Sequence, residues 1–196
     1  TGGFSTKNAS IGYFDSPLIE WILIVAMFLS SLHFGLIYST FTRKANNIFR
    51  SEVVRVYAGV ILFSGVAIAI SLYFAGIYTD WLQSFRDSIF QVVSIITTTG
   101  FATADTSCWP SLSILILVFL SIQCACSGST SGGLKTDRII IFWKSFRVQL
   151  QKQMHPSAVI PVRVGSTVVE SSLVSAVNLY IVVYFLLMFI GAAFFV

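Results

Sequence analysis

Two short stretches of this sequence nearly repeat each other: Thr1-Gly2-Gly3-Phe4-Ser5-Thr6 at its start and Thr98-Thr99-Gly100-Phe101-Ala102-Thr103 near its middle. We call them the first thread (1–6) and the second thread (98–103). Both are polar and contain glycine, and long apolar segments lie between them. Inside a membrane, irregular backbone is tolerated only where protein buries it or water reaches it. A repeated thread of this kind favours a pore lined by backbone carbonyls.

The composition is that of a membrane protein. Of the 196 residues, 56% are hydrophobic and 10% are charged, and the mean hydropathy is +0.85, whereas a soluble domain is about 25% charged. The net charge is +4. Cys108, Cys124 and Cys126 have neither disulfide-framework nor zinc-ligand spacing, and we expect the last two to be small buried hydrophobes. Because the sequence opens inside a motif, we expect a fragment of a longer protein.

Four segments are long and apolar enough for membrane helices, which need about 20 residues: 17–41, 56–78, 110–127 and 171–196. Segment 80–97 is shorter and carries Asp80, Arg86 and Asp87. We expect it to form a short re-entrant helix capped by Asp80. A spanning helix, a re-entrant helix, a glycine thread and a second spanning helix make up a pore-loop channel subunit.

The basic residues predict the orientation. Ten of the twelve Lys and Arg residues lie beside or between the first two segments or between the last two, so these loops are expected to be cytoplasmic and both threads to face outward. The acidic residues Asp15, Glu20, Asp80, Asp87 and Asp105 fall on the outer side. They would raise the local cation concentration. A plain positive-inside pattern accounts for the basic residues without any partner.

The repeat predicts the fold class, an all-α polytopic membrane protein built from pseudo-repeats of helix, pore loop and helix. Residues 1–50 would hold the thread and second helix of one repeat. Residues 51–165 would hold a complete repeat whose second helix is broken, and residues 166–196 the first helix of the next.

The threads have the chemistry of an ion filter. Potassium that enters a narrow filter loses its water shell, and carbonyl oxygens must replace it. Glycine allows the backbone to approach the ion, while Phe4 or Phe101 would pack outward. The helix before the second thread would aim its negative C-terminal end at the cation. The alternative is an ordinary turn after a helix, which the second copy of the motif disfavours. The predicted filter residues are Thr1, Gly2, Gly3, Phe4, Thr98, Thr99, Gly100 and Phe101, with K+ held only by filter carbonyls.

A second polar run interrupts the third apolar segment. We interpret it as a flexible break that opens or blocks the path, formed by Gly128, Ser129, Thr130, Ser131, Gly132, Gly133 and Lys135. A phosphate-binding loop requires glycine directly before Lys-Ser/Thr, but Leu134 stands between Gly133 and Lys135. The plainer alternative is a helix end followed by a cytoplasmic loop.

These motifs resemble the Trk/Ktr/HKT superfamily of potassium transporters, with the bacterial TrkH branch as the most similar. The resemblance rests on the two threads, on Cys126–Lys135 and on His155–Val162, in this order, and covers essentially the whole chain. Ser131 departs from the bacterial pattern, which more often has glycine there.

The resemblance implies a multi-pass potassium-uptake subunit of the bacterial inner membrane, with four pseudo-repeats of which this chain holds the second filter segment, the third repeat and the first helix of the fourth. It implies carbonyl binding of K+ near Gly3 and Gly100 and an intramembrane gating loop at 128–133. It also implies a homodimer and a cytosolic, TrkA- or KtrA-like regulatory subunit carrying NAD, ATP or ADP. We expect no covalent cofactor and no binding of nucleic acid. Besides the protein partners, we expect contact with membrane lipid.

Three alternatives stay open. A related transporter could pass Na+ or couple K+ to H+ or Na+. A membrane enzyme or nucleotide-binding subunit could use Ser129, Thr130 and Lys135, although no activating base lies close in sequence, so we expect no enzyme. A structural scaffold would have inert threads.

Overall fold

The structure, a computed structural model, describes residues 3–42, 51–154, 160–165 and 167–194. The described chain is mostly helical. It divides into two units, Thr1–Gly133 and Leu134–Val196. The domain limits predicted from the repeat, 1–50, 51–165 and 166–196, stay a prediction.

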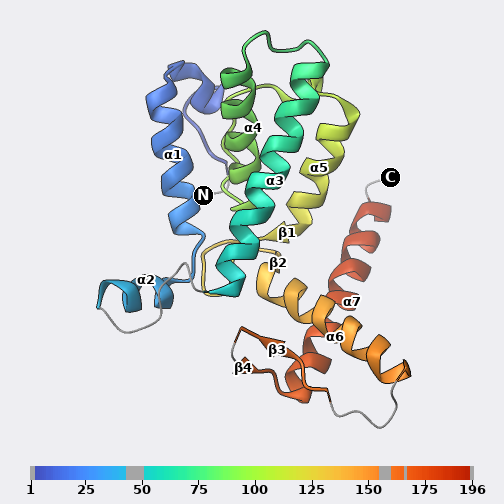
Figure 1. Ribbon diagram of the computed structural model, residues 1–196. Helices are drawn as coiled ribbons and strands as arrows, with labels where there is room; N and C mark the ends of the chain where they lie inside the picture. The colour runs from blue at the N-terminus through green and yellow to red at the C-terminus, as the bar shows by residue number, and fades with distance from the viewer. Residues whose placement is uncertain (1–2, 43–50, 155–159, 166, 195–196) are drawn as a thin grey trace. The chain divides into compact units, whose positions relative to one another are not determined.

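The first unit is a group of helices around α4 (Trp81–Ile96), which contacts α1 (Pro17–Ser30), α3 (Glu52–Phe74) and α5 (Ser111–Ile122). Figure 1 shows these four helices side by side. The remaining elements are short: η1 (Ser10–Phe14), α2 (Phe34–Phe41), η3 (Thr106–Cys108) and β1 (Gln123–Cys124). Because α4 is central, ten of its sixteen residues are buried.

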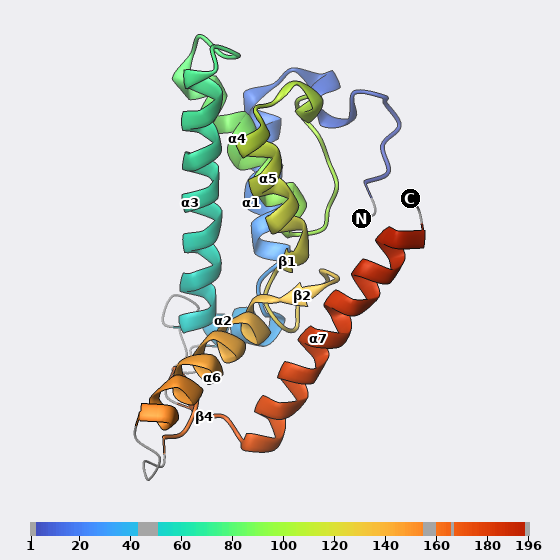
Figure 2. The ribbon, with the colours of Figure 1, turned by 90° about the vertical axis from the view of Figure 1, so that its right-hand side faces the viewer.

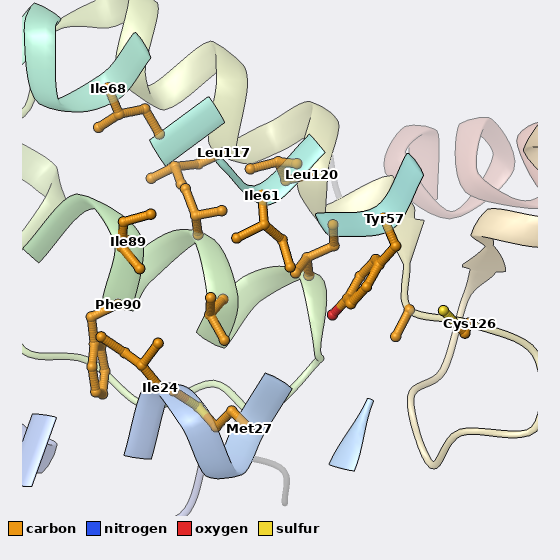
Figure 3. Close-up of a cluster of buried hydrophobic side chains, with 14 of the residues drawn as sticks. Ile24, Met27, Tyr57, Ile61, Ile68, Ile89, Phe90, Leu117, Leu120 and Cys126 are labelled. Carbon is orange, nitrogen blue, oxygen red and sulfur yellow. The ribbon is translucent and has the colours of Figure 1, made fainter. Parts of the chain in front are cut away.

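The apolar core of this unit is drawn from all four helices. Figure 3 shows Ile24 of α1, Ile61 of α3, Phe90 of α4 and Leu120 of α5 directed into one cluster. Tyr57 and Cys126 belong to the same cluster, and neither is more than 1% exposed. The buried Cys126 fits the expectation of a small hydrophobe, and so does Cys124.

Helices α3 and α4 approach each other closely at Gly65. A Cβ atom built on Gly65 would lie 2.5 Å from Cδ1 of Ile89. Nearby, the hydroxyl of Ser84 donates to the Ala69 carbonyl at 3.0 Å, which links the two helices by a buried hydrogen bond. Small and hydroxyl-bearing residues of this kind let membrane helices pack tightly.

The second unit contains β2 (Leu134–Lys135), α6 (Thr136–Met154), β3 (Arg163–Val164), β4 (Thr167–Val168) and α7 (Ser171–Phe194). Strands β3 and β4 pair antiparallel. Figure 2 shows α7 as a long helix that leads away from them. Helices α6 and α7 are in contact, and the guanidinium of Arg138 lies 3.8 Å from the centre of the Tyr180 ring.

Two of the four predicted membrane segments form long apolar helices. Among the described residues, α3 and α7 have the length and composition to cross a membrane. Helix α4 begins where Asp80 predicts, because the Asp80 carboxylate accepts the amide of Leu82 at 3.1 Å.

The prediction of one continuous helix over 17–41 was wrong. Helix α1 ends at Ser30 and α2 begins at Phe34. The hydroxyl of Ser30 donates to the Met27 carbonyl at 2.8 Å, and that of Ser31 to the Phe28 carbonyl. Serine hydroxyls that bond back to the preceding turn bend or end a helix.

A helix over the whole of 110–127 was also wrong, since α5 ends at Ile122. Gln123 is already extended, with φ of −83° and ψ of 122°. The segment from Gln123 to Cys126 therefore continues as non-helical backbone, and the break begins before the glycine-rich run that we expected to cause it.

Candidate functional site: two threads and a glycine-rich loop

The second thread begins at the end of α4. Thr98 and Gly100 both have left-handed backbones, with φ of 54° and 79°. The amide of Thr98 donates to the Ile95 carbonyl at 2.9 Å, and the amide of Thr99 to the Ser94 carbonyl at 2.9 Å. These bonds satisfy the carbonyls of the last helical turn. The chain thus leaves α4 in a tight bend on which Thr98 and Gly100 are exposed.

The first thread lies against the second. The amide of Gly3 donates to the Thr99 carbonyl at 2.9 Å. Gly3 has φ of 70°, so it shares the left-handed conformation of Gly100, its counterpart in the repeat. A Cβ atom on Gly3 would lie 2.9 Å from the Gly100 carbonyl oxygen, so the close approach requires glycine. Thr1 and Gly2 lie outside the described residues.

Two carbonyls of the second thread are already bound to protein. The Phe101 carbonyl accepts the hydroxyl of Ser94 at 2.6 Å. The Ala102 carbonyl accepts the amides of Ile11 at 3.0 Å and Gly12 at 3.2 Å. These bonds hold the outgoing half of the thread against α4 and against the segment after the first thread.

The carbonyls of Thr98 and Gly100 differ from those of Phe101 and Ala102 in their hydrogen bonding. Within the described part of the chain, no protein donor bonds to either oxygen. Both residues are exposed, whereas Thr99 between them is 7% exposed. The thread therefore presents unbound main-chain oxygens at the bend and bound ones beyond it. The Phe101 side chain packs on the core of the first unit, and Phe4 is exposed.

The glycine-rich loop, residues 127–133, folds back on its own start. The amide and hydroxyl of Ser129 both donate to the Cys126 carbonyl, at 3.2 and 2.6 Å. The Ser129 and Ser131 hydroxyls lie 2.9 Å apart. Gly128 is left-handed, with φ of 78°. The Ser129 hydroxyl thus bonds to the backbone and lies within hydrogen-bond distance of another hydroxyl.

The two ends of this loop bond to different parts of the first unit. The amide of Cys126 donates to the Ser31 carbonyl at 3.3 Å, at the break after α1, and Tyr57 donates to the Ser31 hydroxyl at 2.8 Å. At the other end, the amide of Gly132 donates to the hydroxyl of Thr98 at 3.3 Å. The structure thus brings the predicted filter and the predicted gating loop into direct contact.

The remaining predicted loop residues are placed as follows. Thr130 is exposed, and Gly133 is left-handed with φ of 99°. Lys135 belongs to the second unit. Of the motif His155–Val162, the first five residues lie outside the described part of the chain, as do Arg43, Lys44 and Arg50.

Sequence reasoning missed the place of His33. A Cβ atom on Gly128 would lie 3.0 Å from both Cδ2 and Nε2 of His33. The ring is fixed by the amide of Gly35, which donates to its Nδ1 at 3.0 Å. His33 thus lies in the break between α1 and α2 and against the loop.

A partly buried ion pair connects α1 to α4. Arg86 Nε lies 2.5 Å from Glu20 Oε2, and the two side chains are 16% and 7% exposed. On the same helix, the amide of Gln91 donates to the Ala104 carbonyl at 3.1 Å. The charge within segment 80–97 could have signalled such a pair, but the partner is 66 residues away in sequence and follows only from the fold.

One protein-family model matches nearly the whole chain. The model of TrkH, a cation transport protein, matches residues 1–195. The chain belongs to the TrkH family. Trk system potassium uptake proteins TrkH from Halomonas elongata and Escherichia coli K12 are 38% and 34% identical over 95% and 90% of the chain. TrkG from the latter strain is 32% identical over 93%.

The fold also matches a solved member of the family. The crystal structure of the potassium transporter TrkH from Vibrio parahaemolyticus superposes with a TM-score of 0.89 at 31% identity over 96% of this chain. The chain covers 41% of that structure and 40% and 37% of the two TrkH relatives. It therefore spans about two fifths of their length. These relatives are named as transport proteins rather than enzymes.

Proposed function

We propose that this chain is part of a bacterial potassium-uptake subunit that conducts K+ along the second thread. The observation that carries this proposal is that Thr98 and Gly100, at the end of α4, are exposed residues whose carbonyls accept no hydrogen bond from the described residues. Oxygens that no protein donor occupies can replace the water shell of a cation. The membrane relatives named as potassium uptake proteins support K+ as the ion.

The surroundings of the thread suit a cation. The C-terminal end of α4 carries partial negative charge and leads directly into the bend. On the predicted outer side, Asp105 accepts the amide of Ser107 at 2.9 Å and its hydroxyl at 2.7 Å. These bonds hold the pKa of Asp105 below its ordinary value, so the carboxylate is ionised at neutral pH and attracts cations to the entrance.

The hydrogen bonds of the second thread reduce the number of carbonyls that we propose to coordinate K+. We assign coordination to the carbonyls of Thr98 and Gly100, with Thr99 shared between the ion and the Gly3 amide. Phe101 becomes a supporting residue, because Ser94 already occupies its carbonyl. The first thread contributes the oxygens around Gly3, and the corresponding left-handed glycines support its assignment as the equivalent filter segment.

The glycine-rich loop is proposed as the gate. It contacts Thr98 at the point where α4 turns into the thread, so a cation that moves along the thread toward the loop meets it. Its glycines and short hydroxyl side chains leave few bulky groups to resist movement. The full arrangement has four pseudo-repeats, outward-facing threads and cytoplasmic basic loops. The assembly is a homodimer bound to a cytosolic subunit that carries NAD, ATP or ADP.

The proposal is tested by ion flux through the full-length protein in vesicles. We expect K+ to pass in clear preference to Na+ under matched gradients. Equal passage of Na+ would overturn the K+ assignment. The same vesicles with a fluorescent pH indicator inside distinguish a channel from a K+/H+ symporter, because only the symporter acidifies the lumen as K+ enters. K+ uptake measured with and without Na+ tests K+/Na+ coupling, because only a K+/Na+ symporter loses K+ uptake when Na+ is omitted.

A further inference from the structure

Thr98 occupies a backbone conformation that a β-branched residue rarely adopts. Its φ is 54°, in the left-handed region where the Cβ atom and the following carbonyl crowd each other. The neighbouring left-handed position, Gly100, is filled by the residue that suits it. A threonine in such a conformation is strained, and strained positions persist only where the surroundings hold them. The backbone conformation therefore does not explain why threonine occupies position 98.

The hydrogen bond of the Thr98 hydroxyl explains why threonine occupies this position. Its neighbours Thr97 and Thr99 are buried, with their hydroxyls 2.8 Å apart, so both are directed into protein. The Thr98 side chain is exposed, and its hydroxyl accepts the amide of Gly132 at 3.3 Å. Glycine at position 98 would remove the strain but also this acceptor. The bond joins the first residue of the second thread to the far end of the glycine-rich loop.

The two attachments of the loop differ in strength. At its start, Cys126 bonds to the carbonyl of Ser31, whose hydroxyl is held by Tyr57. All three residues are 2% exposed or less. At its far end, Gly132 and Thr98 are both exposed, so water competes for their hydrogen bond. When the loop moves, the Gly132 end should release first while the start stays fixed.

We propose that the Thr98 hydroxyl is a latch that holds the far end of the loop against the thread and keeps the path closed. This rests on the proposed function. Breaking the Thr98–Gly132 bond frees the loop to swing about its fixed start near Ser31. Because one residue carries both the latch and a filter carbonyl, the position of the loop and the geometry of the thread change together. Thr98 is thus a positioning residue as well as a filter residue.

The test uses the full-length protein with Thr130→Cys as a probe in the loop and Cys108→Ser to remove the exposed thiol of the described residues. The parent without Thr130→Cys gives the background modification rate. The rate of modification by a water-soluble thiol reagent reports loop release and needs no ion conduction. Thr98→Val keeps the shape but loses the hydroxyl. Thr98→Gly loses the hydroxyl and fits the left-handed backbone, so it serves if the valine variant does not fold. Thr98→Ser keeps the acceptor.

The matched control is Thr103→Val, since the hydroxyl of Thr103 is buried and has no hydrogen-bond partner among the residues that the structure describes. We expect Thr98→Val and Thr98→Gly to raise the modification rate at position 130 about three- to tenfold, with a parallel rise in resting K+ flux. Thr98→Ser should match the parent in modification rate, and Thr103→Val should match it in both modification rate and flux. The latch is wrong if the modification rate of both hydroxyl-less variants equals the parent's, or if it rises without any rise in flux. A parent that does not prefer K+ refutes the proposed function instead, whatever the modification rates.

Discussion

Arg86 of α4 and Glu20 of α1 form a partly buried ion pair, with Nε and Oε2 2.5 Å apart. The pair ties the helix that precedes the second thread to a helix that begins shortly after the first. Ionisable groups inside a membrane protein are costly and are kept where they hold structure or function. Here the pair sets the position of α4 relative to α1.

Removing one partner of this pair should destabilise the protein strongly. We expect Glu20→Gln to cost about 1.5–3 kcal/mol, because the partly buried Arg86 loses its charged partner. Thermal unfolding of the full-length protein in detergent measures this. The matched control is Asp15→Asn, which removes an exposed carboxylate at a left-handed position that asparagine tolerates. Equal melting temperatures for the two variants would contradict the role of the pair.

The close approach of α3 and α4 predicts a second effect. Gly65→Ala should destabilise the protein by about 1–3 kcal/mol, since the new methyl group would overlap Ile89. Gly59→Ala lies on the same helix with nothing within 4 Å of the built Cβ, so it should be neutral or stabilise by up to about 1 kcal/mol. The double variant Gly65→Ala with Ile89→Val should recover part of the loss. If it does not, the overlap is not the cause.

The hydroxyl of Ser94 should matter for ion selection more than for folding. Ser94→Ala leaves the Phe101 carbonyl without its donor, at a cost of about 1–3 kcal/mol, and frees the outgoing half of the thread. We expect reduced discrimination between K+ and Na+ in vesicle flux. Ser88→Ala is the control, because Ser88 bonds only within its own helix, to the Ser84 carbonyl. A selectivity loss that is the same in both variants would argue against the thread.

The sequence predicted the long apolar helices and α4 well, because hydropathy and the Asp80 cap act locally. It could not predict the break at Ser31. Serines occur throughout apolar helices, and at this break the Ser31 carbonyl also accepts the amide of Cys126, a residue far along the chain. The early end of α5 could not be predicted either. Nothing in the composition of the run from Gln123 to Cys126 marks Ile122 as the last helical residue.

The candidate site was predicted by residue type but not by connectivity. The repeat located Gly3 and Gly100, yet only the fold reveals that their threads bond to each other. The bond from Gly132 to Thr98 joins residues 34 apart, and the ion pair of Glu20 with Arg86 joins two helices. Such partners follow from three-dimensional packing, which no local pattern encodes.

The most direct test of a carbonyl filter compares two left-handed glycines. Gly100 lies in the second thread and Gly76 in the turn after α3, with φ of 79° and 71°. Alanine imposes a similar backbone strain at both, but only Gly100→Ala displaces thread oxygens. The measurement is the K+/Na+ permeability ratio of full-length protein in vesicles. We predict that the ratio falls sharply, or that uptake is lost, in Gly100→Ala alone. An unchanged ratio and uptake in Gly100→Ala would contradict the central claim.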